Sequence, residues 1–281
     1  MVSERTSRPA PQAVERGIAR RALHRVGADG PLGERALDEV VLEEPLEVRL
    51  AGEPWVTTMR TPGDDPALVL GLLHAEGLVR RARDVARVAP CGTPGEPGWE
   101  NTIDVAPGPG VVFDAAVRRG TLVSAACGVC GRATVDDLVG RLEPPRALPL
   151  SRPLLLGAPD ALAEHQPTFR RTGALHGAAL LDAEGRRLAS AEDVGRHNAV
   201  DKVVGRLLRE ERLARAAVLV VSGRVGFEIV QKAAVARVPA LVAVSGPSSL
   251  AVDLAARAGL VLAAFVRGGR MNVYAGAERL D

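Results

Sequence analysis

Apolar and polar positions follow the clearest pattern in the second half of the chain, where short apolar runs alternate with stretches of helical period. A strand-like run at 178–181 turns at Glu184-Gly185 into a second run at 187–191. Beyond it, the pattern predicts helices at 197–213, 227–235 and 249–258 and strands at 217–221, 240–244 and 260–266. Such alternation is typical of βαβ units with parallel strands. We therefore expect an α/β domain over residues 151–281.

The first half has a different pattern. Apolar and polar residues roughly alternate over 37–60 around the turn residues 51–54, which predicts a pair of strands. An aspartate cap, a first-turn proline and a leucine stripe predict a helix from Asp64 or Asp65 to about Gly77. We expect more short strands up to residue 123 and a short helix at 134–142. Residues 31–150 should therefore form a smaller, mainly-β α+β portion.

Two segments do not fit either pattern. Residues 1–30 are rich in Arg, Ala and Pro without a sustained apolar period, and we expect a mobile basic tail there. The proline-rich stretch 143–153 separates the two halves, so we place the boundary there.

Charge and hydropathy narrow the choice of partners. The formal net charge is +2, from 36 basic and 34 acidic residues among 281. No global field would therefore attract nucleic acid or a membrane surface. No apolar run approaches the roughly 18 residues of a membrane span, and the first residues lack the apolar core of an export signal. We expect a cytoplasmic protein that binds neither nucleic acid nor membrane.

Lysine is scarce: only Lys202 and Lys232 are lysines, and arginine supplies the other basic residues. A lysine in such a sequence suggests a task that arginine performs poorly, such as presenting a compact ammonium to a phosphate or a sulfur carrier. Lys202, with Arg196 and His197 at the start of the same predicted helix, is therefore a candidate cofactor contact. The alternative, equally supported by their spacing, is that residues four apart on this helix stabilise one face.

Three loops should meet at one edge of the predicted sheet. Ser222-Gly223 and Ser245-Gly246 each follow an apolar strand and open a helix, and 267–270 (Arg-Gly-Gly-Arg) follows the last strand. In open α/β sheets ligands bind at the carboxyl ends of the strands, where glycine lets a phosphate approach backbone N–H groups. Two guanidiniums and two flexible peptides in the third loop could clamp a pyrophosphate.

The run Cys127-Gly128-Val129-Cys130 is the other candidate for chemistry. A structural zinc site needs four ligands, yet Cys91 is the only further cysteine, so we expect no metal. Thioredoxin-like pairs open a helix, whereas Gly128 and Gly131 make this peptide flexible. A flexible loop suits a persulfide carrier that visits a donor and an acceptor. Cys127 is the candidate carrier, and Cys130 an assisting thiol.

Several motifs resemble one family, the formate dehydrogenase accessory sulfurtransferases of the FdhD family. The motifs are Ala126-Cys127-Gly128-Val129-Cys130-Gly131, Thr172-Gly173-Ala174-Leu175-His176, the run from Glu192 to Lys202, Ser222-Gly223-Arg224 through Gln231-Lys232, Pro247 to Val252, and Asn272-Val273-Tyr274. The resemblance covers about residues 35–276.

The resemblance implies a function. The family takes sulfur from a cysteine desulfurase as a persulfide and delivers it to the molybdenum bis(molybdopterin guanine dinucleotide) cofactor required by formate dehydrogenase; GDP would mimic part of that cofactor. By this likeness Cys127 is the persulfide cysteine. The implied cofactor-binding segment is Phe265, Val266, Arg267, Gly268, Gly269 and Arg270. The resemblance also implies a homodimer and a three-layer, cytidine-deaminase-like fold with a mixed or parallel sheet for residues 151–281.

A zinc deaminase and a cofactor chaperone are the two other classes of function to consider. A zinc deaminase needs His-x-Glu and a downstream Pro-Cys-x-x-Cys, but His176 is followed by Gly177-Ala178 and the cysteine pair lies upstream, so deamination is disfavoured. A chaperone that binds the cofactor without carrying sulfur stays open. A persulfide on Cys127 separates it from a sulfurtransferase.

Overall fold

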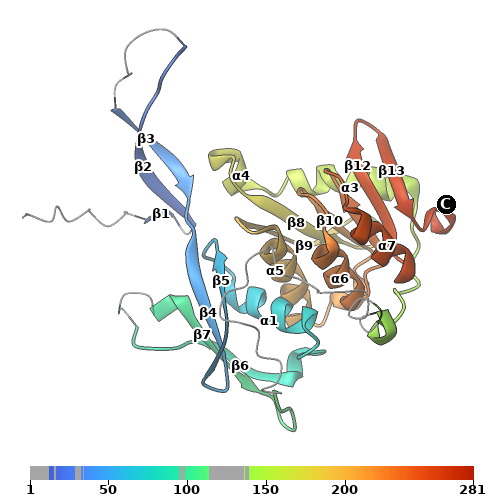
Figure 1. Ribbon diagram of the computed structural model, residues 1–281, viewed down its shortest axis with the longest axis horizontal. Coiled ribbons are helices and arrows are strands. Elements are labelled where there is room, and N and C mark those ends of the chain that lie inside the picture. Colours follow the sequence, from blue (N-terminus) through green and yellow to red (C-terminus); the bar gives the residue numbers. More distant parts are fainter. Residues whose placement is uncertain are drawn as a thin grey trace, which may run out of the picture.

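The computed structural model describes residues 13–15, 17–28, 33, 35–94, 96, 99–113, 136 and 139–281. Figure 1 shows a layered α/β body, a second sheet beside it, and a long two-stranded ribbon that projects away from both. Residues 1–12 of the expected tail and most of the segment from 114 to 138 lie outside the described residues.

A six-stranded mixed sheet forms the α/β body, with the order β13-β12-β11-β10-β8-β9. Its strands are β8 (His176–Leu181), β9 (Arg187–Asp193), β10 (Val218–Val221), β11 (Ala240–Ala243), β12 (Val261–Arg267) and β13 (Arg270–Ala275). Strands β10, β11 and β12 run parallel, and their neighbours β8 and β13 run antiparallel to them. The expected mixed α/β architecture is confirmed.

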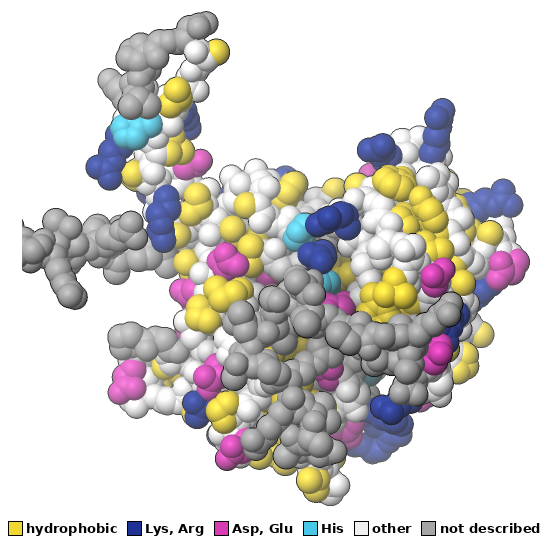
Figure 2. Space-filling model, viewed as in Figure 1, with side chains coloured by type: hydrophobic (Ala, Val, Ile, Leu, Met, Phe, Trp, Pro, Cys, Tyr) yellow, Lys and Arg dark blue, Asp and Glu magenta, His cyan; other side chains and the backbone are white. Residues whose placement is uncertain are grey.

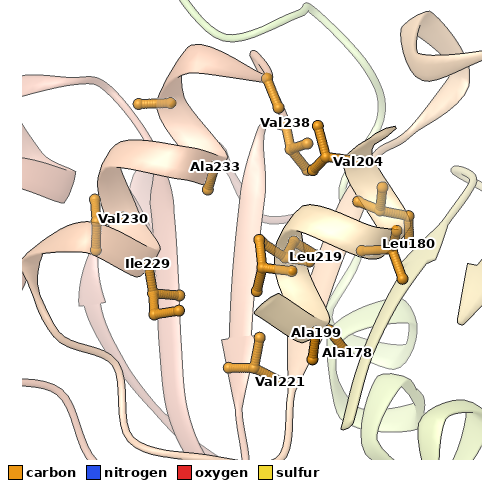
Figure 3. Packing of buried hydrophobic residues seen from close by; sticks show 14 of the residues in the cluster. Ala178, Leu180, Ala199, Val204, Leu219, Val221, Ile229, Val230, Ala233 and Val238 are labelled. Carbon is orange, nitrogen blue, oxygen red and sulfur yellow. The ribbon is translucent and has the colours of Figure 1, made fainter. Parts of the chain in front are cut away.

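Residue alternation along the central strands sets the layers. In β10, Leu219 and Val221 face a cluster with α5 (Arg196–Arg209), α6 (Phe227–Val235) and α7 (Ser249–Arg257), as Figure 3 shows for α5 and α6. Val218 and Val220 face the opposite side, with α3 (Arg152–Ala163). All four side chains are almost fully buried, and each such burial stabilises the fold by about 1.5–3 kcal/mol. Helices therefore cover both faces, in three layers.

The sequence pattern did not reveal all of this body. It placed α5, α6 and α7 within a few residues of their ends, but α3, the short α4 (Pro167–Thr172) and β13 were not predicted. Helix α3 begins in the segment assigned as a boundary, where the Ser151 hydroxyl accepts a hydrogen bond from the Leu154 N–H at 3.3 Å. Pro159 inside the helix weakens its helical signal, whereas Pro153 lies in the first turn, where proline is tolerated.

The first half folds against this body. A four-stranded sheet has the order β5-β4-β7-β6, built from β4 (Glu44–Leu50), β5 (Glu53–Arg60), β6 (Val85–Pro90) and β7 (Thr102–Pro107). The predicted hairpin at 51–54 and helix α1 (Asp65–Ala75) are both present. Short 3₁₀ segments lie at Ala82–Asp84, Trp99–Asn101, Leu213–Arg215 and Ala277–Arg279.

Helix α1 crosses α5 with backbone against backbone. A Cβ on Gly71 would overlap the Asp201 carbonyl, and one on Gly205 would overlap the Ala67 carbonyl. Leu68 of α1 and Val203 of α5 belong to one buried cluster. The two halves of the chain therefore share a continuous core, and the division proposed at residue 150 stays a prediction.

A correction concerns the N-terminal segment. Residues 18–24, assigned to a mobile tail, form β2 (Ile18–His24), which pairs antiparallel with β3 (Arg35–Val41) from Ile18 opposite Val41 to His24 opposite Arg35. Strand β1 (Ala13–Glu15) continues this sheet. The hydrogen bonds of β2 are made with a partner strand farther along the chain. The apolar pattern of residues 18–24 alone cannot reveal that partner. Figure 1 shows the β2–β3 ribbon standing out from the body.

Candidate functional site

Two of the three predicted loops lie side by side at the carboxyl ends of β10 and β11. The Val225 N–H donates to the Gly246 carbonyl at 3.1 Å, and the Ser248 N–H donates to the Val225 carbonyl at 2.9 Å. The Ser222 hydroxyl accepts from the Gly177 N–H at 2.9 Å and so fixes the first loop to β8. Ser222-Gly223 and Ser245-Gly246 therefore form one continuous rim.

Phe265 belongs to this rim and has an uncommon backbone conformation. Its N–H donates to the Ser245 carbonyl at 3.3 Å, its φ is 55°, and its side chain is 40% exposed. A Cβ added to Gly246 would lie only 2.6 Å from the tip of the Phe265 ring, so the ring is seated on that glycine. Left-handed backbone at a bulky residue costs about 1–3 kcal/mol and is found mostly where function requires it.

The Arg267–Arg270 segment is a tight hairpin turn between β12 and β13. Arg267 pairs with Arg270, and Gly268 and Gly269 have φ of 56° and 70°, as a two-residue type I′ turn requires. The glycines therefore serve the turn, and the pyrophosphate clamp expected from Arg267 and Arg270 stays a prediction. Strand β12 continues two residues, or ~7 Å, past Phe265. Both arginines are exposed and lack side-chain partners among the described residues, so their guanidiniums are available at the rim.

Basic groups and free helix N–H groups converge beside Gly223. A Cβ there would lie 3.1 Å from His176 Nδ1 and 3.7 Å from the Arg196 Cβ. Gly195 and Gly226 are the N-cap residues of helices α5 and α6, and neither helix start receives a side-chain cap. The first N–H groups of a helix without such a cap favour an anion.

Arg196 and His176 lie in surroundings that disfavour positive charge. Arg196 Nε is buried without a hydrogen-bond partner among the described residues. Burial, and then the charges of Arg196 and Arg224, lower the pKa of His176. The local electrostatic potential is therefore positive, and a bound anion would reduce the repulsion between these groups. Figure 2 shows Arg or Lys and His side chains gathered near the centre of this face.

His197 links two helices. Its Nδ1 lies 3.2 Å from Glu228 Oε2, which ties the start of α5 to the first turn of α6. Burial, reinforced by Arg196, Lys232 and His176, lowers the pKa of His197 to about 3. The imidazole is therefore neutral at physiological pH. It can orient neighbours, but it adds no positive charge to the site.

The interpretation of Lys202 as a cofactor contact is wrong, because its ammonium is buried and fully paired inside the protein. Lys202 is 3% exposed, and its ammonium lies 2.7 Å from Asp193 Oδ2, 2.8 Å from the Thr61 carbonyl and 3.4 Å from the Glu192 carbonyl. An ammonium has three protons, and these acceptors use them all. Lys232 is likewise buried, with both oxygens of Asp201 at 2.8 and 2.9 Å. Both lysines form internal ion pairs.

Asp193 is the centre of the first of these pairs. Its carboxylate is fully buried and accepts hydrogen bonds from the Thr61 N–H at 3.2 Å, the Gly195 N–H at 2.8 Å and the Asn198 amide at 3.0 Å. These bonds join the loop after β5 to the start of α5. Most of the run from Glu192 to Lys202 is therefore structural, and it fixes the position of Arg196.

The cysteine pair cannot be placed in this geometry, since Cys127 and Cys130 lie outside the described residues. Cys91 is exposed in the segment after β6. Sequence reasoning named Arg196 beside His197 and Lys202, but it gave no binding role to His176 or Arg224. The signal for Arg224 was its place directly after the Ser222-Gly223 loop. Among the described residues, no helix is long and apolar enough to cross a membrane.

Comparisons with known proteins agree on one family. The model of the FdhD/NarQ family matches residues 41–281. The "Sulfur carrier protein FdhD" of Anaeromyxobacter dehalogenans (strain 2CP-1) is 53% identical over 260 residues, covering 88% of this chain and 90% of that protein. Its namesake from Streptomyces coelicolor is 46% identical, over 90% of this chain and 92% of that protein.

A solved structure has the same fold. It is the crystal structure of a protein from Desulfotalea psychrophila assigned as a formate dehydrogenase accessory protein, with a TM-score of 0.76 and 23% identity. The match covers 94% of this chain and all of that one.

Proposed function

Because this chain belongs to the FdhD/NarQ family, we propose that it is a sulfur carrier that supports a formate dehydrogenase. The support is the similarity to proteins named as sulfur carriers, which are about half identical to this chain over nearly their whole length.

Cys127 is the proposed carrier. Its thiolate attacks the terminal sulfur of a persulfide on a cysteine desulfurase, the donor's cysteine thiolate leaves, and Cys127 becomes a persulfide; no external oxidant is needed. Cys130 assists. The terminal sulfur then passes to the molybdenum bis(molybdopterin guanine dinucleotide) cofactor, which is the substrate. The Cys127 thiolate is the leaving group, and two electrons, from the reduced metal or from a thiol reductant, bring the transferred sulfur to the level of sulfide. The working form is a cytoplasmic homodimer.

The rim at the carboxyl ends of β10, β11 and β12 is the proposed docking surface for the guanine nucleotide ends of that cofactor. The observation that carries this assignment is Phe265, held at positive φ with its exposed ring on Gly246. Such a ring offers a stacking surface for a purine base, a contact worth ~1–3 kcal/mol.

Cationic side chains near the Phe265 ring could bind the phosphate groups of a nucleotide. The exposed Arg267 and Arg270 follow Phe265 in the β12–β13 hairpin. Arg196, the first residue of α5, lies beside Gly223 of the neighbouring loop, together with the uncapped start of α6. Guanidinium groups bind phosphate oxygens in pairs, and free helix N–H groups favour the same anion.

The test of the carrier is the intact mass of the protein after incubation with a cysteine desulfurase and cysteine. A reducible gain of one sulfur, ~32 Da, should appear in wild type and in Cys130→Ala and be absent in Cys127→Ala. A gain lost only in Cys130→Ala would transfer the role to that residue. No gain in any form, with GDP still bound, would favour the cofactor chaperone.

The docking surface is tested separately by calorimetric titration with GDP. Phe265→Ala and Arg270→Gln should weaken GDP binding without reducing the sulfur gain, whereas Cys127→Ala should bind GDP like wild type. If all three variants lose both functions together, the carrier and the docking surface are not separate.

A further inference from the structure

A cavity of about 900 Å³ lies at the end of α6 that is far from the rim. Helix α6 places Glu228 next to His197 at its first turn, whereas Gln231 and Val235 line this cavity. The helix has nine residues and is therefore ~13 Å long. The cavity also borders the C-terminal ends of α1 and α5, so it is separate from the proposed nucleotide rim.

Positive charge dominates the lining of the cavity. Among the described residues that border it are Arg80, Arg81, Arg83, Arg141, Arg146 and Arg237. The acidic residues in the lining are Glu76, Glu143 and Glu211. The excess of guanidinium over carboxylate sets up a field that attracts anions into a concave site.

Helices α1, α5 and α6 end at this cavity. Arginines near helix C-termini often only stabilise the negative end of the helix dipole and its free carbonyl groups. That explanation fits Arg146, which donates to the Ala236 carbonyl at 2.6 Å and the Arg237 carbonyl at 3.2 Å. Arg237 is also paired, with Glu143 at 2.6 Å. Helix capping and ion pairing therefore explain these two arginines.

The same explanation fails for Arg80, Arg83 and Arg141. Each is exposed, and none has a side-chain hydrogen bond or ion pair with another described residue. Arg146 is also poorly compensated, because burial and the neighbouring Arg237 lower its pKa. Three guanidiniums without a hydrogen bond or close ion pair to any described residue therefore border the same cavity as Arg146, although the charge of Arg83 also acts on the Asp84 carboxylate.

We propose that this cavity binds a small molecule that carries a diphosphate or two separate phosphate groups. Guanidinium forks match phosphate oxygens in paired hydrogen bonds, and several around one cavity suit a ligand with more than one phosphate. Cavities of 300–1,000 Å³ enclose drug-sized ligands, so there is room for an organic group as well. Leu142, which is half-buried, and the exposed Ala214 border the cavity and provide apolar surface for that group.

The test is calorimetric titration of the full chain with inorganic pyrophosphate. The double variant Arg83→Gln/Arg141→Gln should weaken one binding event by at least ~10-fold, since a hydrogen bond to a charged group contributes about 1.5–3 kcal/mol. The control Arg87→Gln/Arg187→Gln has the same charge change at exposed residues outside the cavity lining and should bind like wild type.

Arg196→Gln, at the rim, should leave that binding event unchanged. An equal loss in the Arg87→Gln/Arg187→Gln control would show a general charge effect and overturn the proposal. Weaker pyrophosphate binding in Arg196→Gln would also overturn the proposal, and so would the absence of pyrophosphate binding in wild type. Binding of a hexaglutamate peptide that requires Arg83 and Arg141 but does not compete with pyrophosphate would also overturn it, and would assign the cavity to an acidic protein segment.

Discussion

Replacing Lys202 with methionine separates two roles for this residue, an internal ion pair and a phosphate contact. Methionine keeps most of the length and apolar volume of the side chain and removes only the ammonium. In the structure that ammonium lies 2.7 Å from Asp193, whose carboxylate is fully buried. The variant therefore leaves a buried carboxylate without its cation, though with three other hydrogen-bond donors.

The expected cost in the free energy of unfolding follows from this geometry. Removing one partner of a buried ion pair costs about 3–5 kcal/mol, because the remaining charge stays desolvated. For chains of 150–250 residues, 1 kcal/mol shifts Tm by about 2–4 °C. Lys202→Met should therefore lower Tm by ~6–20 °C.

Thermal unfolding followed by circular dichroism measures this shift, and GDP titration below the transition measures binding by the folded form. Arg87→Met, which removes an exposed cation on β6, is the matched control and should change Tm by less than ~2 °C. Lys202→Arg keeps the charge but inserts a larger group where only 3% of the side chain is exposed, so it too should lower Tm.

The reasoning would be refuted by a Lys202→Met variant that unfolds at the wild-type temperature but binds GDP at least tenfold more weakly. Rescue of that binding by Lys202→Arg would point the same way, since a guanidinium keeps the positive charge and can donate hydrogen bonds to phosphate oxygens. Both results together would restore Lys202 to the docking surface.

Three further outcomes are expected. Gly246→Ala should displace the Phe265 ring, whose tip lies 2.6 Å from the added Cβ, and weaken GDP binding ~5- to 100-fold; in the Phe265→Ala background it should have no further effect. Because the pKa of His197 is lowered to about 3, its contribution to stability is complete above pH ~6.5 and falls as the pH drops towards 3, by ~2 kcal/mol at pH 5. The fall in Tm from pH 7 to pH 5 should therefore be smaller in His197→Gln; an equal fall would contradict this assignment. Cys91→Ala should retain the full sulfur gain in the intact-mass assay; loss of that gain would implicate Cys91 in the transfer.

Local pattern determined much of the fold. Apolar strands alternate with helical stripes in the second half, so β10, β11 and β12 and the three helices of one layer were predictable within a few residues. Parallel strands place their following loops at one edge, and this rule also predicted that the Ser222 and Ser245 loops lie together. The family motifs identified the cysteine pair, which the described residues do not include.

Tertiary structure decided what individual polar residues do. Lys202 binds the carbonyl of Thr61, 141 positions away, and Lys232 binds Asp201, 31 positions away. Strand β2 exists because β3 completes its ladder, and the exposed ring of Phe265 rests on a glycine from another loop. Local periodicity reports which face of a strand or helix is apolar. The partner of a buried charge depends on which backbones pack together, and only the folded chain brings those groups within hydrogen-bond distance.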